Sequence, residues 1–395
     1  MRNAAVPTLL PVYQRADLSF ERGEGCWLIG HDGRRYLDFS SGIAVNGLGH
    51  GHPHLIAALE QQARRLWHVS NLYRIDQLER LADRLVAASF AETVFVCNSG
   101  AEAMEACIKM ARRHHHAAGR PERNRIVTFT GAFHGRTMAT ISAAGGAKLI
   151  DGFAPLLPGF DHVPFGDHDA LHAAIGPQTA AVMIEPIQGE GGIRPVPRAC
   201  LEGLRELCDQ HGILLIYDEV QCGIGRTGRL FGYATLGAPP PDIMGLAKGL
   251  GCGFPIGACL ATGRAAAGMT VGTHGSTFGG NPLACAVANA VLDIMLEPGF
   301  LDAVAARGEM LGAGLERLVN EHPTVLAERR GHGLLRGLRV VPPVAEVVAA
   351  CREAQLLVVP AADNVIRLLP PLIVQPVEID DALDRLGRVC ARLRG

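Results

Sequence analysis

Between residues 90 and 262 the chain alternates short, uninterrupted apolar runs with longer segments of helical periodicity. Uninterrupted apolar runs predict strands that are buried on both faces, which is typical of a mostly parallel sheet. The helical segments between them, such as residues 101–113, predict crossover helices and therefore an α/β domain. The predicted strands are residues 93–97, 125–130, 180–184, 213–217, 242–247 and 257–261.

The two ends of the chain follow another pattern. Residues 27–38 predict two strands around a His-Asp-Gly turn, residues 301–322 a long amphipathic helix, and residues 334–374 a strand-rich stretch. We therefore expect a smaller α+β domain that is built from both termini. The predicted division is residues 1–49 for an N-terminal arm and part of the small domain, 50–282 for the large domain, and 283–395 for the rest of the small domain.

The composition argues against several kinds of partner and location. With 48% hydrophobic and 19% charged residues the chain is globular, and a net charge of -2 offers no basic surface for nucleic acid or an anionic membrane. No apolar run reaches the ~18 residues of a membrane helix. Residues 1–11 are interrupted by Pro7 and Pro11 and are too short for a secretion signal. We expect a cytoplasmic protein without nucleic-acid or membrane partners.

Cysteine and histidine positions argue against a disulfide framework and a metal site. The 11 cysteines show no spacing of zinc ligands, and Cys97, Cys107, Cys208 and Cys285 lie within apolar patterns, so we expect reduced, buried thiols. Histidines gather in residues 50–54 and 114–116. Consecutive residues on a helix point to different sides, so the run 114–116 cannot share one ion, and no metal site is predicted.

Two charged residues follow neighbouring predicted strands. Asp218 comes directly after the strand 213–217, and Lys248 directly after the strand 242–247. Parallel strands end at one edge of the sheet, where open α/β folds bind their ligands. Pyridoxal phosphate needs a lysine that binds it covalently and an acid that keeps its pyridine nitrogen protonated. The sequence therefore predicts a pyridoxal-phosphate enzyme with Lys248 and Asp218 as catalytic residues.

The cofactor also needs a phosphate site and contacts for its ring. Residues 98–102 (Asn-Ser-Gly-Ala-Glu) join a predicted strand to a helix, and a helix N-terminus suits a phosphate dianion. We expect Ser99, Gly100 and Ala101 to contact the phosphate. Phe133 is the candidate for stacking on the ring, and Gln221 for a hydrogen bond to the ring's phenolic oxygen.

Several sequence motifs, and the order in which they follow one another along the chain, resemble those of the class III, ornithine-type branch of the fold-type I aminotransferases. The resemblance runs from residue 13 to about residue 374 and implies a pyridoxal-phosphate-dependent homodimer. The matching motifs are residues 47–53, 98–103, 132–136, 185–192, 218–228, 247–248 and 275–282.

Further roles follow from the resemblance. Arg136 is similar to the arginine that binds a substrate carboxylate, and Arg367 to a second carboxylate-binding arginine, a task that suits the guanidinium fork. Glu190 is similar to the glutamate that pairs with that second arginine in one half-reaction and swings away in the other. Such a gate would let one pocket accept both an ω-amine and glutamate.

The resemblance also implies contacts at the subunit interface and in the substrate pocket. Thr277 is similar to a threonine that reaches the cofactor phosphate of the neighbouring subunit. Tyr13 and Ser276 match substrate-contacting positions. Gly42 stands where ornithine aminotransferases have a tyrosine, and a glycine there would leave space for an acyl group on the substrate's α-nitrogen.

The substrate implied by the resemblance is N2-acetyl-L-ornithine, whose δ-amino group would pass to 2-oxoglutarate. The products would be N-acetyl-L-glutamate 5-semialdehyde and L-glutamate, a step of arginine biosynthesis. Succinylornithine, the succinylated diaminopimelate precursor and free ornithine remain open, because a few methylenes change binding by only ~1–3 kcal/mol. Two departures leave cofactor affinity open: Ala101 replaces a threonine, and Cys252 interrupts a run of glycines.

A nicotinamide-dependent Rossmann oxidoreductase is the alternative from another class. Residues 223–228 fit the GxGxxG pattern and follow a predicted strand. The motif should open a helix, but residues 231–233 and 238–242 break the stretch that follows it, and no acidic residue ends a second strand about 20 residues on. We therefore disfavour this alternative.

Overall fold

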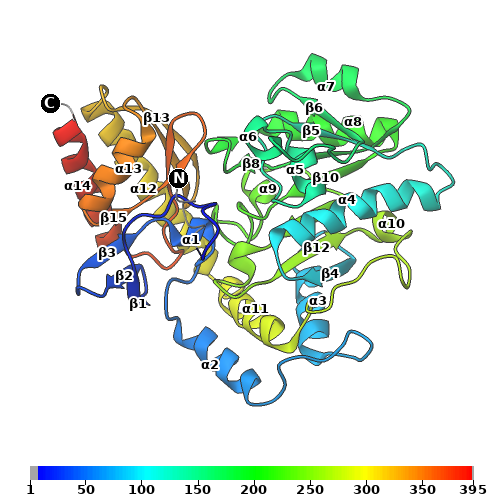
Figure 1. Ribbon diagram of the computed structural model, residues 1–395, viewed down its shortest axis with the longest axis horizontal. Coiled ribbons are helices and arrows are strands. Elements are labelled where there is room, and N and C mark those ends of the chain that lie inside the picture. The colour runs from blue at the N-terminus through cyan, green and yellow to red at the C-terminus, as the bar shows by residue number, and fades with distance from the viewer. Residues whose placement is uncertain (1–7, 394–395) are drawn as a thin grey trace, which may run out of the picture.

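The computed structural model describes residues 8–393, so most of the apolar start at residues 1–11 lies outside the described part. Figure 1 shows two groups of elements side by side, with the N-terminal strands next to the C-terminal helices and strands on one side. A small domain built from both ends of the chain therefore adjoins a larger α/β domain. The boundaries at residues 49 and 282 stay predictions.

A mixed, mostly parallel sheet forms the centre of the large domain. The strands are, in spatial order, β4 (Thr93–Cys97), β12 (Gly257–Ala261), β11 (Ile243–Leu246), β10 (Leu214–Asp218), β7 (Thr179–Ile184), β5 (Arg125–Phe129) and β6 (Phe160–Val163). β10 pairs in parallel with β7 and β11, whereas β12 is antiparallel to both of its neighbours. The six predicted strands are present, and the structure adds β6.

Helices cover both faces of this sheet. Leu214 and Ile216 of β10 pack in one cluster with side chains of α4 (Gly100–Ala117), whereas Leu215 and Tyr217 pack in another with side chains of α8 (Arg198–His211). Because successive strand residues point to opposite faces, α4 and α8 lie on opposite sides of the sheet. The remaining helices between residues 50 and 270 are α2 (Pro53–Ala63), α3 (Asp76–Ala87), α5 (Met138–Ala144), α6 (Ala147–Ile150), α7 (His168–Ala174), α9 (Gly232–Thr235) and α10 (Gly263–Ala266).

Two four-stranded sheets form the small domain. In the first, β1 (Phe20–Glu24), β2 (Trp27–Gly30) and β3 (Arg35–Asp38) are joined by β15 (Leu356–Leu357), which pairs in parallel with β3 and so ties the two chain ends together. The second has the order β13 (Leu326–His332), β14 (Leu335–Val340), β17 (Val365–Leu368) and β16 (Val359–Ala361), all antiparallel. The helices are α12 (Phe300–Glu321), α13 (Val344–Glu353) and α14 (Pro376–Leu393).

The expectation of a strand-rich stretch over residues 334–374 needs a correction, because α13 interrupts it. The segment from Val344 to Glu353 has buried Val347, Val348 and Cys351 at helical spacing. The β-branched residues of this segment favour a strand. The segment is nevertheless a helix, because its apolar residues recur with a period of 3.6 and pack against α14.

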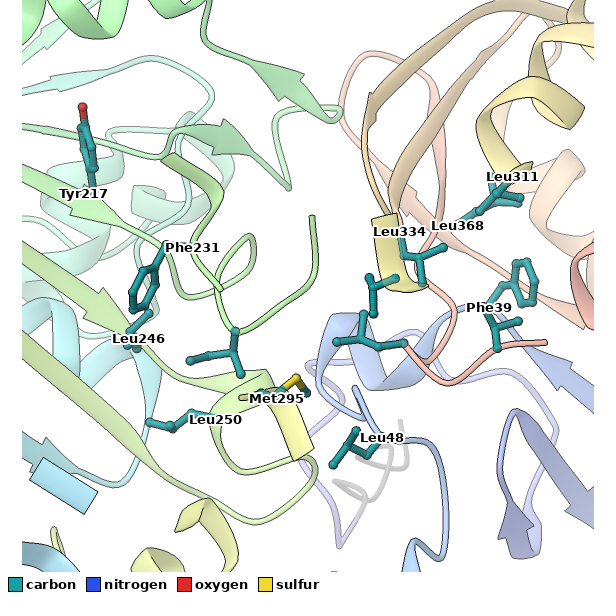
Figure 2. Packing of buried hydrophobic residues seen from close by; sticks show 14 of the residues in the cluster. Phe39, Leu48, Tyr217, Phe231, Leu246, Leu250, Met295, Leu311, Leu334 and Leu368 are labelled. Carbon is teal, nitrogen blue, oxygen red and sulfur yellow. The ribbon is translucent and has the colours of Figure 1, made fainter. Parts of the chain in front are cut away.

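The two domains share one hydrophobic core. Figure 2 shows Leu246 and Leu250 of the large domain, Met295 between the domains, and Leu334 and Leu368 of the small domain within a single cluster. Met295 ends α11 (Pro282–Met295), which packs on α2 and α3 and also contacts α12. Among residues 8–393 no single helix is long and apolar enough to span a bilayer; α11 and α12 reach that only as a pair bent by 73°.

Candidate active site

A cavity of about 380 Å³ opens where β10 and β11 end, at the predicted edge of the sheet. Asp218 is the last residue of β10, and Lys248 starts a short 3-10 turn (Lys248–Leu250) soon after β11. Both line the cavity, together with Ser99, Gly100, Ala101, Phe133, Arg136, Glu190 and Gln221. The structure therefore brings together most of the residues that the sequence singled out.

Asp218 is only 3% exposed and is held at both carboxylate oxygens. Its Oδ2 lies 2.7 Å from Nδ1 of His134, and its Oδ1 accepts a hydrogen bond from the Val220 N–H at 3.0 Å. Burial lowers the pKa of the His134 imidazole, but the hydrogen bond and negative charge of Asp218 outweigh it, so this pKa is raised. The pair places a hydrogen-bonded carboxylate in a buried position at the cavity, where it could serve as the partner of a pyridinium.

His134 is a functional candidate that the sequence reasoning missed, and Glu185 is another. Glu185 follows β7, is 5% exposed, and accepts hydrogen bonds from the N–H groups of Phe133 at 3.0 Å and Gly189 at 3.2 Å. Burial, together with the nearby charge of Asp218, raises the pKa of its carboxyl group to about 7. One buried carboxyl group thus joins the segment that carries Phe133 to the loop that carries Glu190.

The N-terminus of α4 forms one wall of the cavity. Ser99 is the N-cap, and its hydroxyl accepts a hydrogen bond from the Glu102 N–H. The first N–H groups of a helix have no partner within the helix and point outward. A Cβ at Gly100 would lie 2.8 Å from Cγ1 of Val220, so only glycine fits there. This wall, together with the buried Asp218, fits the phosphate and the pyridine nitrogen of pyridoxal phosphate.

The amine of Lys248 is set up as a nucleophile. The pKa of Lys248 is lowered to about 8, mainly because the amine is buried; the negative charge of Glu190 opposes this shift and the positive charge of Arg367 adds to it. The residue has a φ of 45°, in the left-handed region that a lysine rarely adopts. The lowered pKa increases the fraction of neutral amine near neutral pH, which suits covalent binding of a carbonyl group.

Arg367 and Glu190 form an ion pair across the two domains. Arg367 lies in β17 of the small domain and is 1% exposed, whereas Glu190 is 34% exposed on a loop of the large domain. Nη1 of Arg367 donates to Oε1 of Glu190 at 2.5 Å and to Oε1 of Gln221 at 3.3 Å. Its Nε has no partner among the described residues. A guanidinium with an unused donor is therefore covered by a carboxylate that is itself partly open to solvent.

Arg136 differs from Arg367 because its guanidinium makes no hydrogen bond or ion pair with any residue from 8 to 393. Its Cζ lies 5.5 Å from the centre of the Phe133 ring, and both side chains line the cavity. A free guanidinium at the open side of the cavity suits a carboxylate ligand.

Five residues singled out from the sequence do not line this cavity, and one of them is Arg367, which contacts the lining residues Glu190 and Gln221. Thr277 is exposed, and Tyr13 is 72% exposed. Ser276 reaches the site indirectly, because its hydroxyl accepts a hydrogen bond from Nδ2 of Asn98, which lines the cavity. Gly42 is exposed in α1 (Ser41–Ala44), where φ is positive at all residues, so a glycine there also relieves backbone strain.

The remaining sequence motifs have structural explanations. His115 is buried and contacts the Ala180 carbonyl through Nε2 at 2.9 Å, and Cys97, Cys107, Cys208 and Cys285 are buried and free. Residues 223–228 form turns before the short α9, without the helix that a dinucleotide site requires. The remaining short strands, β8 (Ile187–Gln188) and β9 (Arg194–Pro195), form a hairpin that encloses the loop of Glu190.

Comparison with known proteins identifies the family. The family model of the class-III aminotransferases matches residues 11–390. The chain belongs to the class-III aminotransferases. This class depends on pyridoxal phosphate, in agreement with the cavity described above.

Individual relatives match this class-III aminotransferase over almost its whole length. Acetylornithine aminotransferase 1 of Bradyrhizobium diazoefficiens is 58% identical over 100% of this chain and 97% of its own length. A Pseudomonas aeruginosa protein described as succinylornithine transaminase/acetylornithine aminotransferase is 46% identical over 98% and 95%. The crystal structure of N-acetylornithine aminotransferase from Stenotrophomonas maltophilia superposes with a TM-score of 0.84 at 39% identity, covering 97% and 98%. The fold-type I prediction is confirmed.

Proposed function

We propose that this aminotransferase moves the δ-amino group of N2-acetyl-L-ornithine to 2-oxoglutarate, giving N-acetyl-L-glutamate 5-semialdehyde and L-glutamate, as in arginine biosynthesis. The observation that carries the proposal is the unequal state of two arginines, Arg136 in the wall of the cavity and Arg367 next to Glu190 and Gln221 of that wall. Arg136 is free, whereas Arg367 is covered by Glu190. The names of the relatives at 58% and 39% identity support the same substrate.

Each residue has a distinct task. Bound pyridoxal phosphate would supply a protonated ring that withdraws electrons from the substrate carbon. Lys248 holds the cofactor, and its Nζ then takes the proton from the substrate carbon that bears the amino group and later returns it. Asp218, with His134 beside it, keeps the ring nitrogen protonated. Ser99, Gly100 and Ala101 bind the phosphate.

The remaining cavity residues orient the ring and the substrate. Phe133 and Gln221, which both line the cavity, would hold the ring, Phe133 through its aromatic face and Gln221 through its amide group. Arg136 binds the α-carboxylate of the acylated ornithine, whose reacting δ-carbon carries no carboxylate. Glutamate does carry one at its reacting carbon. For that substrate Glu190 moves away and Arg367 binds the carboxylate, so one cavity accepts both donors.

The assembly and location belong to the same proposal. Thr277 and Tyr13 lie outside the cavity and are exposed in the single chain, which is expected if they complete the site of a second copy in a homodimer. Ser276 would stand beside the substrate through its bond to Asn98. The ten cysteines from Cys26 to Cys351 form no disulfide bond, which supports a reducing, cytoplasmic location.

The test isolates the first half-reaction. Purified holoenzyme is mixed with N-acetylornithine, N-succinylornithine, ornithine or 4-aminobutyrate without a keto acid, and the change in cofactor absorbance is followed. Fast conversion by N-acetylornithine, with slow conversion by ornithine and 4-aminobutyrate, is the expected result. Equal or faster conversion by N-succinylornithine would make the succinyl donor the better substrate, an alternative that the mixed name of the Pseudomonas relative favours. Ornithine as the fastest donor would overturn the proposal.

A further inference from the structure

The glycine-rich segment 223–228 forms no dinucleotide site, but it lies where the two domains meet. A Cβ at Gly228 would lie 2.9 Å from Cβ of Ala305 in α12, and a Cβ at Gly333 of the small domain would lie 2.6 Å from Cα of Thr227. Such distances leave no room for a side chain, so the two backbones can approach this closely only where glycine is present. The segment therefore forms a close contact surface for the small domain.

Arg226, within this segment, holds two backbone positions of the small domain. Its side chain is buried, and its Nη1 donates to the backbone carbonyl of Leu334 at 3.3 Å and to that of Pro370. The backbone takes part as well, because the Leu334 N–H donates to the Arg226 carbonyl at 3.1 Å. The side chain of Leu334 packs in the core that both domains share (Figure 2).

The guanidinium of Arg226 is a buried cation without a counter-ion, since the residue forms no ion pair with any residue from 8 to 393. Burial lowers the pKa of Arg226 to about 10, so the group is still charged at neutral pH. Removing a charge from water costs free energy that hydrogen bonds must offset. For Arg226 the acceptors of Nη1 belong to the other domain, so its charge stabilises the contact between the domains.

Both carbonyl groups held by Arg226 lie close to Arg367 in the structure. Pro370 follows Arg367 shortly after the end of β17, and Leu334 directly precedes β14, which pairs with β17. On the side of the large domain, Gln221 lies in the same stretch of chain as Arg226 and accepts from Nη1 of Arg367 at 3.3 Å. This stretch therefore contacts the guanidinium of Arg367 directly and also holds the backbone next to its strand.

Other contacts between the domains near Arg367 come from the loop that carries Glu190. The Glu190 carboxylate accepts from Arg367, and the Glu190 carbonyl accepts from the Ala362 N–H at 2.9 Å. A movement of this loop would disturb both contacts. The hydrogen bonds of Arg226 do not involve the loop, so they can hold β17 in place while Glu190 is displaced.

We propose that Arg226 is a positioning residue for Arg367 and keeps its guanidinium within reach of the carboxylate at the reacting carbon of glutamate or 2-oxoglutarate. The inference rests on the proposed function, because it takes Arg367 as the group that binds this carboxylate. N-acetylornithine has no carboxylate at its reacting carbon. Loss of Arg226 should therefore impair the reaction with glutamate and spare the one with N-acetylornithine, whereas loss of a residue that only stabilises the fold would impair both alike.

The test compares the two half-reactions of the holoenzyme by single-turnover absorbance, with glutamate or N-acetylornithine as the donor and no keto acid. Arg226→Met keeps an unbranched side chain but removes every donor. The second-order rate constant for glutamate should fall by about tenfold or more, mainly through weaker glutamate binding, while that for N-acetylornithine should change by less than about twofold. Arg226→Lys, which keeps a charged donor, should recover part of the loss.

Arg123→Met is the matched control. Nη1 of Arg123 also donates to two backbone carbonyl groups, those of His211 at 3.0 Å and Gly212 at 3.2 Å, but both belong to the large domain. This variant should leave the ratio of the two rate constants unchanged, even if it lowers the stability. Thermal unfolding followed by circular dichroism checks the fold of each variant.

Two more variants decide whether Arg226 acts through Arg367. Arg367→Gln alone should impair the glutamate reaction selectively, and adding Arg226→Met to it should lower that rate constant by less than about twofold further. Equal losses for both donors in Arg226→Met, no loss for either, or full additivity in the double variant would overturn the positioning role while the assignment of Arg367 stands. An unchanged glutamate reaction in Arg367→Gln would refute that assignment, and the positioning role with it.

Discussion

The two ends of the active-site cavity are built in different ways. At the cofactor end, Lys248, Asp218 and the N-terminus of α4 all belong to the large domain and lie where its strands end. At the substrate end, Arg367 comes from the small domain and Glu190 from a partly exposed loop of the large one. We expect a site held within one domain to stay fixed during turnover. A site shared between two domains changes whenever they or the loop move, which a gate for two substrates requires.

The largest effect should follow from removing the side chain of Lys248 at the cofactor end. Lys248→Ala leaves no amine to hold the cofactor or move the proton, so the rate of the half-reaction with N-acetylornithine should fall by about 10⁴-fold or more. Single-turnover absorbance measures it. Lys148→Ala, on an exposed lysine, is the matched control and should keep the wild-type rate. A Lys248→Ala enzyme with near wild-type turnover would refute this assignment.

Removing the gate should change selectivity more than overall rate. Glu190→Gln takes the negative charge from Arg367, so the carboxylate of glutamate gains access to that arginine. We expect kcat/KM for glutamate relative to N-acetylornithine to rise about tenfold, which corresponds to about 1.4 kcal/mol. Glu202→Gln, which breaks an exposed pair with Arg198, controls for lost charge. An unchanged ratio would argue that Glu190 is only structural.

The charges of Glu190 and Arg367 at the substrate end should change the pKa of Lys248 at the cofactor end. Because a neutral amine attacks the cofactor, the rate at which apoenzyme captures pyridoxal phosphate should rise as the pH passes about 8, the pKa of Lys248, and level off above it. Glu190 raises this pKa, so Glu190→Gln should move the midpoint to lower pH. Arg367→Gln should move it to higher pH. Stopped-flow absorbance gives the midpoints, and shifts in the reverse directions would contradict the described charges.

The smallest effect concerns cofactor affinity. Ala101→Thr would add a hydroxyl in the first turn of α4, and one extra hydrogen bond is worth roughly 2–10-fold in affinity. The dissociation constant of pyridoxal phosphate, measured by equilibrium dialysis, should fall by that factor. Ala101→Ser adds the hydroxyl with less bulk next to Gly135. Weaker binding in both variants would show that alanine is already the better residue.

The sequence predicted the fixed end better than the movable one. Lys248 and Asp218 each follow an apolar run, and the strand-end rule places them without knowledge of distant contacts. The same rule applied to β7, which pairs with β10, would have found Glu185. His134 was harder, since its partner Asp218 lies far along the chain, although both the residue before it and Arg136 were already singled out.

Contacts between domains could not be read from the sequence. The pairing of Glu190 with Arg367 was implied by resemblance alone, because no local pattern relates a loop after β8 to a strand of the small domain. α13 was missed since its β-branched residues favour strand when neighbours are ignored. The positive φ values of residues 41–44 also depend on the tertiary setting, so the reading of Gly42 as space for an acyl group remains a prediction.

The central claim is that Lys248 holds the cofactor, and the chain is well suited to a direct test because its lysines are Lys109, Lys148 and Lys248. Holoenzyme would be reduced with sodium borohydride, which makes the bond between cofactor and amine permanent, then digested and analysed by mass spectrometry. The account predicts the mass of the reduced cofactor on the peptide that contains Lys248, in stoichiometric yield. Label on Lys109 or Lys148, or on no lysine, would contradict it.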